Sequence, residues 1–146
     1  MPDKNSVQKS VFIAYTPYHI FIAWLMALEN RGKNIDHQLV IFSNFADAEI
    51  LYKSLLKSKS LPFSKVILLK GEYGYHTLGL FKRGYARFIV GKQTCRELVK
   101  FIKRENFQRI FLFNEDRPSS LYLLKYVETV KDKVSISFVE DGAITY

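Results

Sequence analysis

Apolar runs and polar turns alternate along this chain in a pattern typical of an α/β protein. Residues 10–15 form an almost entirely apolar run, which is typical of a strand buried on both faces of a sheet. Thr16 and Pro17 follow at once, and these residue types favour the N-cap and the first position of a helix. The pattern therefore predicts a strand, a tight turn and a helix from about Pro17 to Asn30. The apolar stripe of that helix contains Ile20, Phe21, Trp24, Leu25 and Leu28.

The same pattern repeats to the end of the chain. Ser43 and Asn44 are candidates to cap the second helix. No Pro/Gly linker interrupts the alternation, which predicts one domain over residues 1–146 with a flexible lead-in at 1–9. Five strands and four helices favour a Rossmann-like three-layer α/β/α sandwich around a mainly parallel sheet. The further strands are expected at 37–42, 65–69, 109–113 and 134–138, and the further helices at 46–58, 87–105 and 119–130. The third helix should turn Cys95, Leu98, Val99 and Ile102 inward.

Residues 70–86 interrupt this rhythm with four glycines and three tyrosines, and they predict a long mobile segment. Lys82, Arg83 and Arg87 make its end basic, which could serve a phosphate or an acidic sugar. A solvated charged face is the favoured interpretation of these three residues. His37 and His76 are interpreted as structural or exposed rather than catalytic.

The closing stretch, residues 134–143, reads as a buried strand that runs into Glu140, Asp141 and Gly142. Ligands of open α/β sheets bind at the carboxyl ends of the strands. Adjacent carboxylates can raise the pKa of one of the two, which suits acid–base chemistry, although a solvated strand end with a glycine turn explains the same residues. Two more loops should reach this edge, residues 16–19 and 114–118. Tyr18 and His19 add hydrogen-bonding side chains that a plain helix start does not require.

Charge, cysteine count and the lengths of the apolar runs limit the classes of binding partner and the cellular compartment that fit this chain. The formal charge of +8 favours anionic partners without choosing among nucleic acid, acidic lipid and acidic sugar. Cys95 is the single cysteine, so an internal disulfide is impossible. The N-terminus lacks a secretory leader pattern, and the longest apolar run, Ile20–Leu28, is too short to span a bilayer. These features predict a cytoplasmic protein that is soluble or at most peripheral to the inner membrane.

Several common enzyme classes lack their signatures in this chain. There is no Gly-x-Gly-x-x-Gly after the first strand, no P-loop motif and no Gly-x-Ser-x-Gly elbow. Three dispersed histidines and one cysteine offer no metal-ligand spacing. The sequence therefore predicts no metal site and no bound cofactor.

Two stretches together carry a family resemblance: Val-Phe-Ile-Ala-Tyr-Thr-Pro-Tyr-His at 11–19 and Phe-Val-Glu-Asp-Gly-Ala-Ile-Thr-Tyr at 138–146. They resemble the N-terminal half of bacterial sialyltransferases and polysialyltransferases that build capsules and lipooligosaccharides. The resemblance covers the chain from about Val11 onward. It implies one half of a GT-B fold and a transfer of sialic acid from a CMP-linked donor with inversion and without a metal. By the same resemblance Asp141 is the general base, Glu140 is its neighbour and Gly142 makes the turn that presents it.

The resemblance also implies roles for residues at the other loops. Tyr18 and His19 would lie near the glycan acceptor, and Thr16, Pro17 and Asn114 would belong to the same substrate-binding edge. The family's donor domain, with its His-Pro motif, has no counterpart here, because the chain contains no His-Pro. We therefore expect the acceptor-side domain of a longer enzyme, inactive without its C-terminal partner domain.

A different class of function explains the same sequence. A small basic Rossmann-like binding module could recognise nucleic acid or an acidic polymer through residues 70–87, without catalysis. Under the glycosyltransferase hypothesis nucleic acid is the less favoured partner, and a glycan acceptor is the expected one.

Overall fold

The computed structural model describes residues 6–71, 80–130 and 133–139, with only the backbone described at 80–88. Five strands alternate with four helices, as the sequence predicts. The strands are β1 (Gln8–Ala14), β2 (Ile35–Ser43), β3 (Lys65–Lys70), β4 (Arg109–Leu112) and β5 (Ser135–Phe138). The helices are α1 (Pro17–Glu29), α2 (Ala48–Lys57), α3 (Leu80–Glu105) and α4 (Pro118–Thr129).

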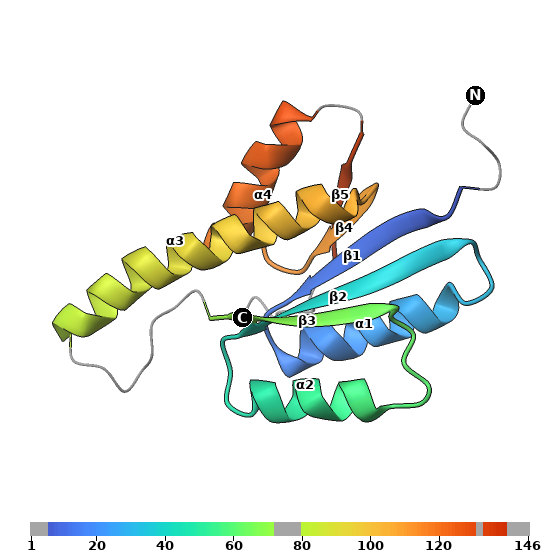
Figure 1. Ribbon diagram of the computed structural model, residues 1–146, viewed down its shortest axis with the longest axis horizontal. Coiled ribbons are helices and arrows are strands. Elements are labelled where there is room, and N and C mark those ends of the chain that lie inside the picture. The colour runs from blue at the N-terminus through green and yellow to red at the C-terminus, as the bar shows by residue number, and fades with distance from the viewer. Residues whose placement is uncertain (1–5, 72–79, 131–132, 140–146) are drawn as a thin grey trace, which may run out of the picture.

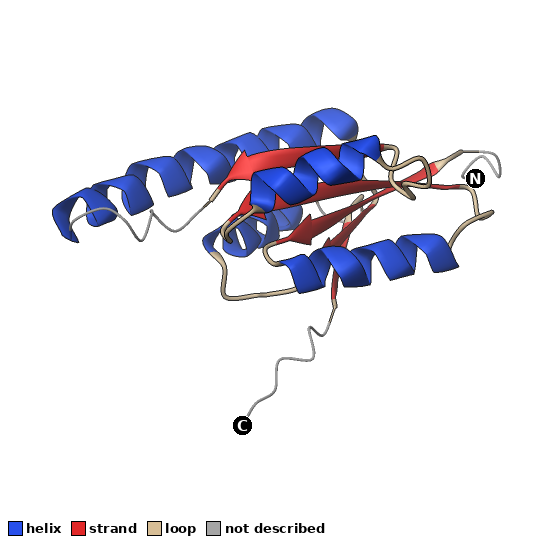
Figure 2. Cartoon of the chain, turned by 90° about the horizontal axis from the view of Figure 1, so that it is seen from below, coloured by secondary structure: helices blue, strands red, loops and turns tan. Residues whose placement is uncertain are grey.

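All four strand pairings are parallel, in the order β3-β2-β1-β4-β5. Helices α1 and α2 cover one face of the sheet, while α3 and α4 cover the other (Figure 1). Figure 2 shows the twisted sheet enclosed between these two helical layers. The chain therefore has the predicted Rossmann-like three-layer architecture, and its strand order reverses between β1 and β4.

A hydrophobic core lies on each face of the sheet, and β1 contributes to both. Val11 and Ile13 pack toward α3 and α4, whereas Phe12 and Ala14 pack toward α1 and α2. The first strand is thus buried on both faces, as predicted. The inward side of α3 is also confirmed, since Cys95, Leu98 and Ile102 are buried and Val99 is partly buried.

Two predicted helix starts are wrong. Helix α3 begins at Leu80, so residues 80–86 are helical rather than part of a long loop. Gly84 lies inside this helix, where a glycine weakens a helix by about 1 kcal/mol without breaking it. Asp47, in a left-handed conformation with φ 62°, precedes α2 as its N-cap, in place of Ser43 or Asn44. Pairing of β2 with β3 extends to Ser43, which keeps that residue in the sheet.

Two expected burial patterns also differ from the structure. Strand β5 is an edge strand with intermediate or exposed side chains, and Phe138 is 51% exposed. In α1 the buried positions are His19, Ile20, Ala23 and Ala27. The small alanines let the helix approach the sheet closely, so Phe21 and Leu25 face solvent.

Candidate functional site

The turn after β1 brings the first predicted site residues to the carboxyl edge of the sheet. Thr16 is the N-cap of α1, and its hydroxyl oxygen accepts a hydrogen bond from the backbone N–H of His19 at 3.2 Å. Pro17 is the first helical residue, where its missing N–H costs nothing. Both capping predictions are confirmed. Tyr18 comes next and is 47% exposed at this edge.

His19 is built into the protein rather than displayed on its surface. Its side chain is 3% exposed, and Nδ1 accepts a hydrogen bond from the backbone N–H of Tyr15 at 3.2 Å. The imidazole stacks on Phe113 with ring centroids 4.7 Å apart and an interplanar angle of 9°. These contacts hold the end of β1 against the end of β4, which gives His19 a positioning role at this edge.

Asn114 lies directly after Phe113 and shapes the loop that follows β4. Its side-chain oxygen accepts a hydrogen bond from the N–H of Asp116 at 2.9 Å, and its carbonyl oxygen accepts one from the Ser120 hydroxyl at 2.5 Å. The first bond closes a turn of the kind that asparagine favours, and the second ties the loop to the start of α4. Asn114 is partly buried, so part of it remains open to a ligand.

Tyr15 joins these two loops across the reversal point of the sheet. Its hydroxyl lies 2.6 Å from the Ser119 hydroxyl and 3.2 Å from the Ser120 hydroxyl, both at the start of α4. Its ring stacks against Phe42, and the Arg117 guanidinium lies 5.2 Å from the ring centre. No local sequence pattern marks Tyr15, which ends an apolar run, or the paired serines, which resemble ordinary helix-start residues.

The predicted site residues therefore fall into two groups. Thr16, Pro17, Tyr18, His19 and Asn114 follow the neighbouring strands β1 and β4, so the structure brings them to one edge. Glu140, Asp141 and Gly142 lie outside the described residues. Strand β5, which precedes them, pairs with β4, and the N–H of Val139 donates to the Leu112 carbonyl at 2.7 Å. In open α/β sheets the point where the strand order reverses is the usual ligand crevice.

A second candidate surface lies on the opposite layer, between α3 and α4. A groove of about 350 Å³ there brings several cations beside two tyrosines. The Lys103 ammonium lies 5.2 Å from the Tyr126 ring centre, which is a cation–π contact. The groove is lined by Arg96, Val99, Lys100, Lys103, Tyr122, Lys125, Tyr126 and Thr129.

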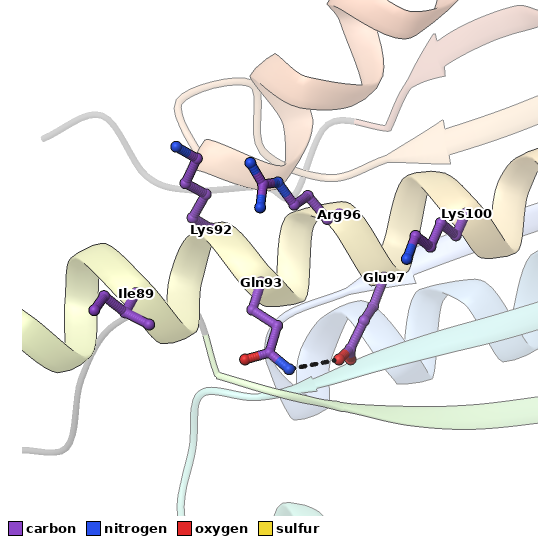
Figure 3. A pocket seen from close by; sticks show the side chains of 6 residues that line it. All are labelled: Ile89, Lys92, Gln93, Arg96, Glu97 and Lys100. Carbon is purple, nitrogen blue, oxygen red and sulfur yellow. Dashed lines mark hydrogen bonds between the residues drawn. The ribbon is translucent and has the colours of Figure 1, made fainter.

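A further hollow of about 500 Å³ continues this basic surface along α3. Figure 3 shows Lys92 and Arg96 projecting from the same side of the helix, one turn apart. Gln93 and Glu97 project from the other side, and the Gln93 amide donates to the Glu97 carboxylate at 3.3 Å. The row of cations would attract an extended anion, because successive charges lie about 6 Å apart along a helix.

A buried histidine lies at the amino edge of the sheet, away from both surfaces. The His37 ring is 6% exposed, and its Nδ1 lies 2.5 Å from the Ser10 hydroxyl oxygen. Burial lowers the pKa of His37, Asp36 opposes this shift and Arg109 adds to it. His37 is thus buried in the sheet at the end opposite the strand-reversal point, and its interpretation as a structural residue stays a prediction.

The described residues offer no site for a metal ion, since their His, Cys, Asp and Glu side chains form no group of three or more with suitable geometry. Within the same parts of the chain, no helix has the combined length and hydropathy that crossing a membrane requires. No protein-family model matches this chain, and no curated protein matches it.

Proposed function

We propose that this chain is the acceptor-side domain of a glycosyltransferase similar to bacterial sialyltransferases, with a glycan hydroxyl as the acceptor. The observation that carries the proposal is that two polar loops meet at the carboxyl edge of the sheet, where the strand order reverses. Thr16 and Tyr18 come from the β1 side, and Asn114 comes from the β4 side. Hydroxyl and amide groups at such a crevice suit the hydroxyl groups of a sugar.

Asp141 is the proposed general base, by resemblance to the family motif. Its sequence position supports this role, because β5 ends beside β4 and Val139 is hydrogen-bonded to Leu112. A carboxylate within hydrogen-bond reach of the acceptor hydroxyl can take its proton as the anomeric carbon of the donor gains positive charge. The donor in the proposal is a CMP-linked sialic acid, bound by a second α/β domain that completes a GT-B arrangement.

Transfer by the protein together with its donor domain tests this proposal. Asp141→Asn should lower kcat about 10²- to 10⁴-fold while the circular dichroism spectrum stays unchanged. Glu128→Gln is the matched control, because Glu128 is an exposed carboxylate in the last turn of α4, at the opposite end of the sheet. Full activity of Asp141→Asn, or an equal loss in both variants, would exclude Asp141 as the base.

A second candidate function rests on the basic groove between α3 and α4, which favours a module that binds acidic polymers. Its cations Lys100 and Lys103 lie on one side of α3 and line the same groove. Binding of a fluorescent oligonucleotide or of heparin should then weaken steeply with salt. Lys100→Glu with Lys103→Glu should abolish that binding, whereas Lys53→Glu with Lys57→Glu on α2 makes the same charge change elsewhere and should leave most of it.

A further inference from the structure

The exposed face of α1 carries no charged side chain before its last residue, Glu29. No charged residue occurs from Pro17 to Leu28, although the whole chain has a formal charge of +8. Phe21 is 57% exposed and Leu25 is 46% exposed, so these large side chains have no covering element in the described chain. Isolated apolar side chains on a surface are ordinary, but a continuous apolar face marks a binding surface.

This face is hollowed into a groove rather than flat. A groove of about 440 Å³ runs between α1 and α2, and small-molecule sites commonly measure about 300–1,000 Å³. Its lining side chains are all apolar. They are Pro17, Ile20, Phe21, Trp24, Leu25 and Leu28 from α1 and Leu51 from α2.

The groove begins at the edge where the sugar would bind. Pro17 lines one end of it and is also the first residue of α1, next to the N-cap Thr16 and the exposed Tyr18. A ligand lying in the groove would therefore reach the strand-reversal crevice with one end. The other end of the groove, at Leu28, lies about 16 Å further along the helix axis.

We propose that this groove binds the hydrocarbon chain of an acceptor whose sugar head lies at the strand-reversal crevice. The inference rests on the proposed function, and it names the acceptor as an amphiphile rather than a free oligosaccharide. An apolar chain needs no hydrogen-bond partners, whereas an extended peptide would leave most of its backbone groups unpaired, because the lining offers no polar side-chain group beyond the Trp24 indole N–H. No lysine or arginine lines the groove to bind a fatty-acid carboxylate, which favours an uncharged sugar head. Two copies of a chain carrying +8 would repel each other, which disfavours a second copy as the occupant.

Trp24 makes the test direct, because it is the single tryptophan of the chain and it lines the groove. Tryptophan fluorescence should shift to the blue in a saturable way when octyl, decyl or dodecyl β-galactoside is added below its micelle concentration. Affinity should rise about twofold to fourfold for each added methylene, because each methylene is transferred from water into the apolar groove. Free galactose should leave the Trp24 emission unchanged.

Variants of groove residues, with a control on α2, test whether the alkyl galactoside binds in this groove. Phe21→Gln and Leu25→Gln should each weaken dodecyl galactoside binding at least about tenfold, and their exposure lets the fold tolerate them. Ile50→Gln is the control, because Ile50 is 64% exposed on α2 beside Leu51 and does not line the groove.

Four results would overturn the inference. They are an affinity independent of chain length, an equal loss in Phe21→Gln and Ile50→Gln, dodecanoate binding as tight as dodecyl galactoside, and a dimer that Phe21→Gln dissociates. The groove and the proposed function fail separately. If binding depends on chain length but Asp141→Asn keeps full activity, the lipid-binding role of the groove stands and Asp141 is not the base. If binding does not depend on chain length but Asp141→Asn loses activity, the proposed function stands and the lipid-binding role of the groove is rejected.

Discussion

The Tyr15 hydroxyl should be a measurable source of stability, because it joins β1 to α4 across the reversal point. It is 1% exposed and contacts the hydroxyls of Ser119 and Ser120 at 2.6 and 3.2 Å. The Ser120 proton is directed to the Asn114 carbonyl, so Ser120 can only accept from Tyr15. Tyr15→Phe removes these interactions and keeps the ring stacked on Phe42.

The free energy of unfolding should fall by about 1–2 kcal/mol in Tyr15→Phe. A buried hydrogen bond contributes about 0.5–1.5 kcal/mol, and a buried partner left unsatisfied adds to the loss. For a domain of 146 residues this loss corresponds to a Tm lower by about 3–8 °C. Urea unfolding followed by circular dichroism at pH 7 measures the difference directly.

Tyr122→Phe provides the matched control, since Tyr122 is 39% exposed on α4 and should change stability by less than about 0.5 kcal/mol. A double-mutant cycle of Tyr15→Phe with Ser119→Ala should give a coupling energy of about 0.5–1.5 kcal/mol. If Tyr15→Phe is as stable as Tyr122→Phe, or if the cycle shows no coupling, the hydroxyl does not hold α4 to β1.

Three further perturbations test other parts of the fold. Gly71→Ala should lower stability by about 1–3 kcal/mol, because its Cβ would lie 2.6 Å from Asn44 Oδ1 and 2.9 Å from the Ser43 carbonyl oxygen; an unchanged Tm would contradict this contact. Because the pKa of His37 is lowered in the folded protein, below about pH 6.5 the unfolded chain binds a proton at this residue while the folded protein does not. The free energy of unfolding should therefore fall between pH 7.5 and pH 5.5. Urea titrations should show a flatter pH dependence in His37→Gln, and an equal slope in both proteins would show that another group is responsible. Glu105 accepts a hydrogen bond from Lys65 at 2.8 Å, which lowers the pKa of its carboxyl, so Glu105→Gln should cost about 0.5–1 kcal/mol at pH 7. This cost should decline as the pH falls below about 4.5, because the unfolded chain then takes up a proton before the folded protein does, and a cost independent of pH would point to packing instead.

Local patterns in the sequence were sufficient to predict the architecture. The apolar run before Thr16-Pro17 identified β1, because a parallel central strand must be apolar on both faces. Start signals at Pro17 and close to Pro118 were similarly reliable, because proline at a helix start acts through its own backbone geometry.

Properties that depend on neighbours far along the chain could not be predicted in the same way. The α1 stripe was misplaced because apolarity does not reveal which side approaches the sheet, and Ala23 and Ala27 determine that approach. The burial of β5 was overestimated because an alternating pattern does not distinguish an edge strand from a central one. The Tyr15 contacts with Ser119 and Ser120 join residues more than a hundred positions apart, and no local signal marks them.

The strand order also constrains how the chain can fold during synthesis. Strands β1, β2 and β3 are consecutive, so they can pair while the rest of the chain is still being made. Strand β4 pairs with the other edge of β1, and Ser10 meets Arg109 only after about a hundred residues have emerged. Until then β1 is an open, apolar sheet edge, the kind of edge that recruits strands from other chains. Closure of the β1–β4 pair should therefore be the slow step of folding, and aggregation on the ribosome or after dilution from urea should compete with that step.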